Sequence, residues 1–154
     1  MTPGGAWPPG ESYADQAFAV AAGAYAATPE SWELAVHAAI AALFEFLADR
    51  PAETTACIAD ERGAGPAALA RRDRAIDRFA ELLQPGFASA QTPPPVVAEA
   101  IAGGVYELVR NYVLERQLDL LPDAAADATV VALAPFMGVR GAMELVTRIV
   151  QISR

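Results

Sequence analysis

The sequence contains no lysine, a single cysteine and a single histidine, and these scarcities exclude several kinds of site. The lone cysteine, Cys57, excludes an internal disulfide and any zinc site built from cysteines. The lone histidine, His37, has Glu33 one helical turn before it, but two ligands are too few for a specific metal site. The carboxylates form no paired catalytic constellation either. We therefore predict that the protein is not an enzyme and carries no cofactor and no metal.

Charged residues are also scarce, at 19% of the chain, and their formal net charge is −8. An acidic domain repels a phosphate backbone, so the chain alone is expected to bind nucleic acid poorly unless arginines gather in a local patch. No stretch of about 20 apolar residues is free of charge, so no transmembrane helix is expected. The first residues show no secretory signal, and the lone cysteine fits a reducing compartment, which together predict a cytoplasmic protein.

Alanine is abundant, and 54% of the residues are hydrophobic. Alanine is the best helix former, and apolar residues recur here at steps of three and four with no alternating strand pattern. We therefore predict an all-α helical bundle of about six to seven helices. The expected helices cover residues 13–27, 29–49, 51–60, 66–84, 95–118 and 122–137, and the tail from Gly141 could add a last amphipathic helix.

Capping and turn residues set the expected boundaries. Ser12 is placed to cap the first helix, and Thr28-Pro29-Glu30 is typical of the start of the second. Residues 1–10 are rich in glycine and proline, which predicts a flexible arm. The remaining chain divides into one domain over residues 11–138 and a C-terminal tail over residues 139–154.

Four short motifs, in order, resemble the ligand-binding and dimerisation domain of TetR-family transcriptional regulators. In that family an Ala/Leu-rich helix ends in FLA-x-x-P, and a GPAAL-x-RR helix, a GG-x-Y helix and an ALAP[FY]-x-G helix follow. The resemblance covers about Trp32 to Gly138, and its order and spacing carry it. The matching segments are Phe46–Pro51, Gly65–Arg72, Gly103–Tyr106 and Ala132–Gly138.

The resemblance implies a function as well as a fold. It implies a homodimer joined by the last two long helices, and in each subunit a pocket for a small effector that is apolar or aromatic and uncharged to weakly polar. In the family, the effector moves an N-terminal helix-turn-helix domain and releases DNA. Here only about ten residues precede the first expected helix, so DNA binding is expected only through a helix-turn-helix domain absent from this chain. A truncated chain, an orphan sensory domain and a misassigned start all stay open.

Aromatic side chains and the histidine are the candidate contacts for such an effector, because ligand pockets are mostly apolar with a few placed polar groups. Tyrosine suits this role since it offers a ring and a hydroxyl. For each residue, ordinary core packing is the alternative, and for His37 the alternative is an exposed polar stripe beside Glu33. The candidate ligand-binding residues are Trp32, His37, Phe44, Phe79, Tyr106 and Tyr112.

The pair Gly103-Gly104 lies within a long expected helix, where each glycine costs about 1 kcal/mol relative to alanine. Close approach of another helix commonly offsets such a cost. The approach could occur within one subunit, but the resemblance favours a dimer seam. The candidate dimer-interface residues are Val97, Ile101, Gly104, Leu108, Val131 and Ala134.

Two further features have simple structural interpretations. The segment from Arg71 to Arg78 alternates in charge, which is typical of a solvated, salt-bridged helix face, although it could also face an acidic ligand or DNA. Cys57 has no basic residue within one helical turn, so a buried small apolar residue is a better interpretation than a redox sensor. The main alternative to effector sensing is a helical interaction module that forms homo- or heterodimers without a ligand; a small helical enzyme has the least support.

Overall fold

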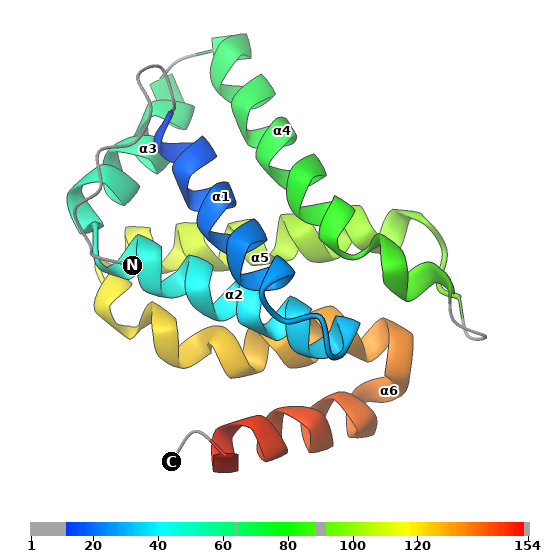
Figure 1. The fold of residues 1–154 in the computed structure, drawn as a ribbon. Coiled ribbons are helices and arrows are strands. Elements are labelled where there is room, and N and C mark those ends of the chain that lie inside the picture. The colour runs from blue at the N-terminus through cyan, green and yellow to red at the C-terminus, as the bar shows by residue number, and fades with distance from the viewer. Residues whose placement is uncertain (1–11, 64, 89–91, 153–154) are drawn as a thin grey trace.

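The computed structural model describes residues 12–63, 65–88 and 92–152, and within these ranges the chain forms six α-helices and no strand (Figure 1). The predicted all-α bundle is therefore confirmed. The α-helices are α1 (Tyr13–Ala26), α2 (Trp32–Ala48), α3 (Pro51–Gly63), α4 (Gly65–Leu82), α5 (Val96–Leu114) and α6 (Ala125–Ile152), and two 3₁₀ segments are η1 (Gln84–Ala88) and η2 (Leu118–Ala124). The predicted arm over residues 1–10 lies outside the described residues.

A capping box begins α1, as the sequence predicts. The Ser12 hydroxyl accepts a hydrogen bond from the backbone N–H of Asp15 at 3.2 Å, and the Asp15 carboxylate accepts one from the backbone N–H of Ser12, also at 3.2 Å. Two N–H groups that the helix itself leaves without acceptors are thereby satisfied.

The predicted start of α2 is three residues too early. Ser31, in extended backbone, is the cap, and its hydroxyl accepts from the N–H of Leu34 at 3.1 Å. Thr28, the predicted cap, instead donates its hydroxyl to the carbonyl of Ala24 in the preceding helix at 3.0 Å. Because serine and threonine compete for the same role, the side chain that faces a free helical N–H becomes the cap.

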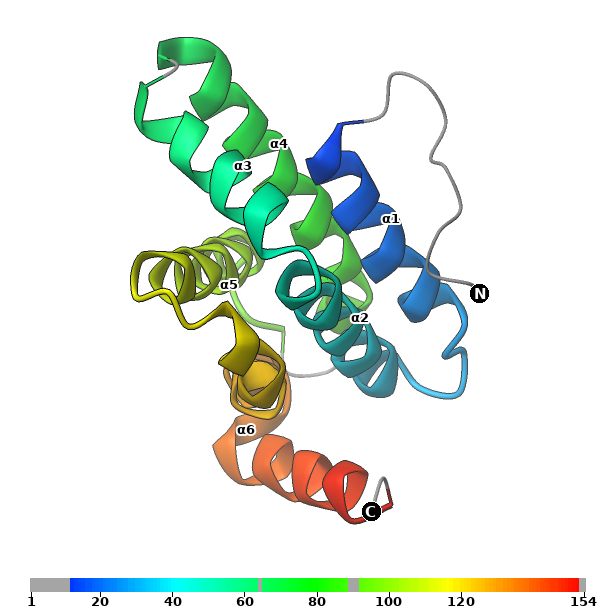
Figure 2. The same cartoon turned by 90° about the vertical axis from the view of Figure 1, so that its left-hand side faces the viewer.

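Helix α2 lies at the centre of the bundle, with α1 along one side and α6 and η2 along another (Figure 2). Val36, Ile40 and Phe44 follow one another at four-residue steps and are at most 1% exposed. Polar side chains are costly where neighbouring helices exclude water. Because α2 is covered on several sides, it is apolar at most positions.

Helix α5 ends at Leu114, four residues before its predicted end. Arg116 has a φ of 57°, in the left-handed region, and the next N–H, that of Gln117, donates to the carbonyl of Tyr112 at 2.9 Å. This is a Schellman-type ending, in which a glycine is the usual residue at the left-handed position. Because arginine occupies this position, the sequence contains no glycine there from which the end of the helix could be predicted.

Helix α6 consists of two helical halves separated at Gly138, which has a φ of 80° and a ψ of 155°. The predicted end of a helix at Gly138 therefore corresponds to a real break in the backbone. The second half turns back below the first (Figures 1 and 2). The tail beyond Gly141 is helical to Ile152, and Ala142 and Val146 are buried in it.

One stretch of the described residues, Leu118–Ile152, is long and apolar enough to cross a membrane, with a mean hydropathy of 1.4. The sequence-based expectation was that no such segment exists. Of the 18-residue segment to which this hydropathy refers, 33% is buried. Ala132 and Leu133, in the first half of α6, lie fully within the bundle core. A helix with one face in a core has this same length and composition, so the stretch is weak support for a membrane span.

Candidate ligand cavity

A cavity of about 390 Å³ opens between α1, α2, α3, α4 and α5. Its size falls within the range of small-molecule sites, and its walls are mostly apolar. Alanines line it on three helices, at Ala17 and Ala21 of α1, Ala75 of α4 and Ala102 of α5. Because facing helices carry methyl groups here instead of larger side chains, the space between them is left unfilled.

One wall of the cavity contains a hydrogen-bonded pair of side chains that joins three helices. The Thr54 hydroxyl of α3 donates to the carbonyl of Leu47 in α2 at 2.9 Å, and the Tyr13 hydroxyl of α1 lies 2.6 Å from the same Thr54 oxygen. Since the Thr54 proton is used by Leu47, Tyr13 is the donor to Thr54. Burial raises the pKa of the Tyr13 hydroxyl, so it stays neutral.

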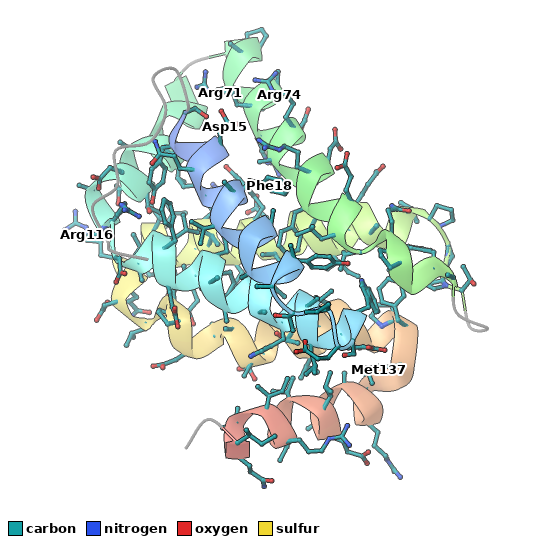
Figure 3. All side chains as sticks on the ribbon, viewed as in Figure 1. Asp15, Phe18, Arg71, Arg74, Arg116 and Met137 are labelled. Atoms are coloured by element: carbon teal, nitrogen blue, oxygen red, sulfur yellow. The ribbon has the colours of Figure 1, made fainter. Side chains whose placement is uncertain are left out.

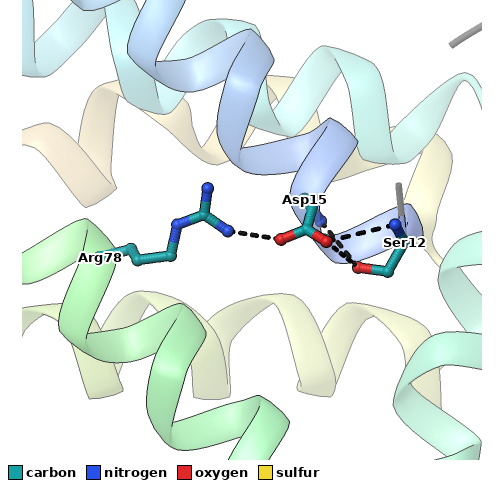
Figure 4. Close-up of polar contacts among 3 residues, drawn as sticks. All are labelled: Ser12, Asp15 and Arg78. Atoms are coloured by element: carbon teal, nitrogen blue, oxygen red, sulfur yellow. Dashed lines mark hydrogen bonds and ion pairs between the residues drawn. The ribbon is translucent and has the colours of Figure 1, made fainter. Parts of the chain in front are cut away.

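An ion pair at the rim ties α1 to α4. The guanidinium of Arg78 donates to the Asp15 carboxylate at 2.6 Å, and the Ser12 hydroxyl donates to the same carboxylate at 2.7 Å (Figure 4). Hydrogen bonds from Ser12 and then from Arg78 hold the pKa of Asp15 below its usual value. The guanidinium also lies over the ring of Phe18, 4.1 Å from its centroid.

Two more arginines of α4 line the cavity beside this pair, Arg71 and Arg74 (Figure 3). The sequence predicted a solvated, salt-bridged helix face here. The salt bridges that α4 forms with described residues run to other helices, from Arg78 to Asp15 of α1 and from Arg72 to Glu107 of α5 at 3.3 Å. Neither Arg71 nor Arg74 forms a salt bridge with a described residue.

Two of the six candidate ligand-binding residues line this cavity, Phe79 and Tyr106. Trp32 lies outside it: its indole N–H donates to the carbonyl of Leu82 at 3.0 Å, and its ring meets that of Phe136 edge to face, with the centroids 5.0 Å apart. This tryptophan therefore joins α2 to the end of α4 and to α6.

The other three candidates also lie outside the cavity. Phe44 is fully buried in the core, and Tyr112 packs against the core from α5. His37 lies 2.9 Å, through Nδ1, from the Thr129 hydroxyl, which itself donates to the carbonyl of Ala125 at 2.7 Å. Nδ1 therefore carries the imidazole proton and donates it to Thr129. Burial lowers the pKa of His37, so the neutral ring is favoured.

His37 thus has a role that neither sequence interpretation included. It is half-buried and bonded to α6, and its partner is Thr129 instead of Glu33. Cys57, interpreted as a small buried residue, is half-buried and lines the cavity. The sequence singled out neither Tyr13 nor Thr54; their pairing depends on how α1 and α3 meet, which no local pattern reveals.

The candidate dimer-interface residues divide into two groups. Ile101 is 6% exposed in the core, Val97 and Leu108 pack against that core, and Ala134 is half-buried. Gly104 and Val131 are exposed, Val131 at 63%. A β-carbon added at Gly103 or Gly104 would meet no atom within 4 Å. No other helix of the described chain therefore approaches this glycine pair closely.

The lining of this cavity suits the binding of a small molecule. Within the described residues no group of three histidine, cysteine or carboxylate side chains is placed to hold a metal ion. The polar groups at its walls are the Tyr13–Thr54 pair and the rim arginines, which suit recognition of a ligand. No protein-family model, curated protein or solved structure matches the chain.

Proposed function

We propose that the chain is the effector-sensing and dimerisation domain of a TetR-type transcriptional regulator. The observation that carries the proposal is the apolar cavity of about 390 Å³, because α1 forms one of its walls. In the family that the sequence resembles, the first helix of this domain joins the DNA-binding head. A ligand in the cavity therefore contacts the element that has to transmit the signal.

The contacts of α1 support such coupling. Among the described residues, its polar and cation–π ties to α3 and α4 are the Tyr13–Thr54 hydroxyl pair and the contacts of Arg78 with Asp15 and with the Phe18 ring. All of these lie at the cavity. A ligand that fills the space between these helices changes the relative free energy of the possible α1 positions. Coupling between sites of this kind typically amounts to about 1–3 kcal/mol.

The test is a thermal-shift screen of the purified chain with small apolar and aromatic molecules, followed by hydrogen exchange on the hits. A hit should raise the melting temperature and slow amide exchange in α1. Ala75→Phe fills the cavity and should abolish both effects, whereas Ala70→Phe, exposed on the same helix and outside the cavity, should preserve them. Hits that stabilise the chain equally with Ala75→Phe would show that the cavity is not the site.

The alternative function is a helical module that forms homo- or heterodimers without sensing a ligand. Exposed apolar side chains on both halves of α6 favour it: Val131 is 63% exposed in the first half, and Val139 and Met143, four residues apart in the second half, are 60% and 56% exposed. Solution scattering at micromolar concentration tests self-association, and co-expression with full-length regulators tests mixed dimers. Dimerisation without any ligand-dependent stabilisation would favour this alternative over the sensor.

A further inference from the structure

We infer that the ligand of the cavity is an apolar carboxylate, held at the rim by Arg71 and Arg74. This inference rests on the proposed ligand-binding function and names the chemical class of its effector. It differs from the sequence-based expectation of an uncharged to weakly polar effector. Three properties of the cavity favour such a ligand: the charge of its rim, the pairing of that charge and the apolar character of the interior.

The rim is cationic although the chain is acidic. Among the described side chains that line the cavity, three arginines stand against one aspartate, since Arg71, Arg74 and Arg78 face only Asp15. The chain as a whole has a net charge of −8. A local excess of two positive charges at the entrance of a pocket attracts an anion and repels a cation.

Pairing distinguishes these arginines from their neighbours on α4. Arg78 is neutralised by Asp15 at 2.6 Å and Arg72 by Glu107 at 3.3 Å. Arg71 and Arg74 form no salt bridge with the described residues, and they lie one turn apart, so their side chains emerge on the same face of the helix. Two guanidinium groups in this arrangement present several N–H donors to one carboxylate.

The interior sets the rest of the ligand. Behind the rim the walls are formed by hydrocarbon side chains, including Leu43, Ile58, Ile76 and Val105. A strongly hydrated anion such as free phosphate would gain nothing from these walls, whereas an alkyl or aromatic body is transferred out of water into them. The two requirements together define an amphipathic acid with its carboxylate at the rim.

Calorimetry with sodium decanoate and with 1-decanol tests the inference, because the two probes share one alkyl chain and differ in the head group. The wild-type chain should bind decanoate more tightly than decanol, and added sodium chloride should weaken only decanoate. Arg71→Gln combined with Arg74→Gln should weaken decanoate about tenfold, which corresponds to the loss of two solvent-exposed ion pairs, and should leave decanol unchanged.

The matched control combines Arg140→Gln with Arg148→Gln, which removes the same charge from exposed positions of α6 outside the cavity. It should bind decanoate like the wild type, and circular dichroism of each variant checks folding. Equal affinity of both probes, or equal loss with both double variants, would overturn the carboxylate inference while leaving the sensing proposal intact. If neither probe binds and Ala75→Phe also alters no ligand response, the cavity itself fails as a binding site.

Discussion

The indole N–H of Trp32 donates its hydrogen bond to the carbonyl of Leu82, the last residue of α4, across 50 positions of sequence. The last carbonyls of a helix receive no hydrogen bond from the helix itself. The Trp32 side chain of α2 supplies a donor to one of them. The first residue of α2 therefore lies at the last turn of α4, and both helices can be followed in Figure 1. The joint also includes Gly86, the buried glycine of η1.

Gly86→Ala should destabilise the protein because this joint leaves no room for a side chain. A β-carbon there would lie 2.7 Å from Cζ2 of Trp32 and 2.9 Å from Cδ1 of Phe136. We expect a loss of about 1–3 kcal/mol in the free energy of unfolding, measured by urea denaturation. Gly23→Ala is the control, since its β-carbon would meet no atom within 4 Å, and it should stabilise α1 by up to about 1 kcal/mol. A neutral Gly86→Ala would contradict the close packing.

Arg116→Gly should stabilise the chain. Arg116 has a φ of 57°, where a residue with a β-carbon is strained and glycine is not. We expect a gain of about 1 kcal/mol in the free energy of unfolding, reduced by the extra freedom of glycine in the unfolded chain. Glu115→Gly, at the neighbouring residue in right-handed helical conformation, should instead destabilise. Similar losses in both variants would show that the left-handed ending is unimportant.

The hydrogen bonds that Asp15 accepts from Ser12 and from Arg78 should make the free energy of unfolding depend on pH at acid pH. The folded-state pKa of Asp15 is lowered from 3.8, so the unfolded chain takes up a proton first as the pH falls. The contribution is therefore present above about pH 4 and is lost as the pH falls through the folded-state pKa. Because the pair is half-exposed, we expect less than about 1 kcal/mol.

The measurement compares urea denaturation of the wild type and Asp15→Asn between pH 7 and pH 3. The wild type should be more stable at neutral pH, and the difference should shrink below pH 4. Asp119→Asn, an exposed carboxylate of η2, controls for the general effect of removing one negative charge. A difference that is constant over the whole range would contradict a role for the charged pair.

His37 should make the free energy of unfolding depend on pH in a second range, closer to neutral pH. Its folded-state pKa is lowered from 6.5 by burial, so the unfolded chain binds a proton that the folded chain does not. Stability is therefore full above pH 6.5 and declines as the pH falls below that value toward the folded-state pKa. Melting temperatures at pH 7.5 and pH 5.5 should differ more in the wild type than in His37→Gln. The same pH response in both proteins would contradict this assignment.

Gly104→Ala separates folding from self-association. The position is exposed and open within the subunit, so alanine should raise the helix stability of the monomer by about 1 kcal/mol. If two copies meet at α5, as the proposed dimer requires, the added methyl group should weaken the dimer measurably in sedimentation or scattering. Ala100→Ser, also exposed on α5, is a control of similar size. A dimer that is unaffected by Gly104→Ala would exclude this glycine from the seam.

Local patterns predicted the helices well but not the cavity. Ser12 and Gly138 marked real boundaries because capping and left-handed backbone depend on a few neighbouring residues. The end of α5 was missed because Arg116 occupies a position where glycine is expected. The glycine break, in contrast, was visible directly in the sequence.

The candidate site was harder to predict because every apolar helix position is compatible with either a core or a pocket. Trp32 and Phe44 are aromatic, as ligand contacts often are, yet they pack against other side chains of the bundle. Phe79 and Tyr106 are also aromatic, and they line the cavity. The difference is made by the distances between helices, which depend on contacts far apart in sequence.

The alanines around the cavity have a consequence for how its specificity can change. Ala17, Ala21, Ala75 and Ala102 leave the volume empty simply by being small. A larger side chain at any of these positions would take up part of that volume. If the cavity binds a ligand as proposed, single substitutions at these alanines would change the shape of the molecule that it accepts, by evolution or in the laboratory.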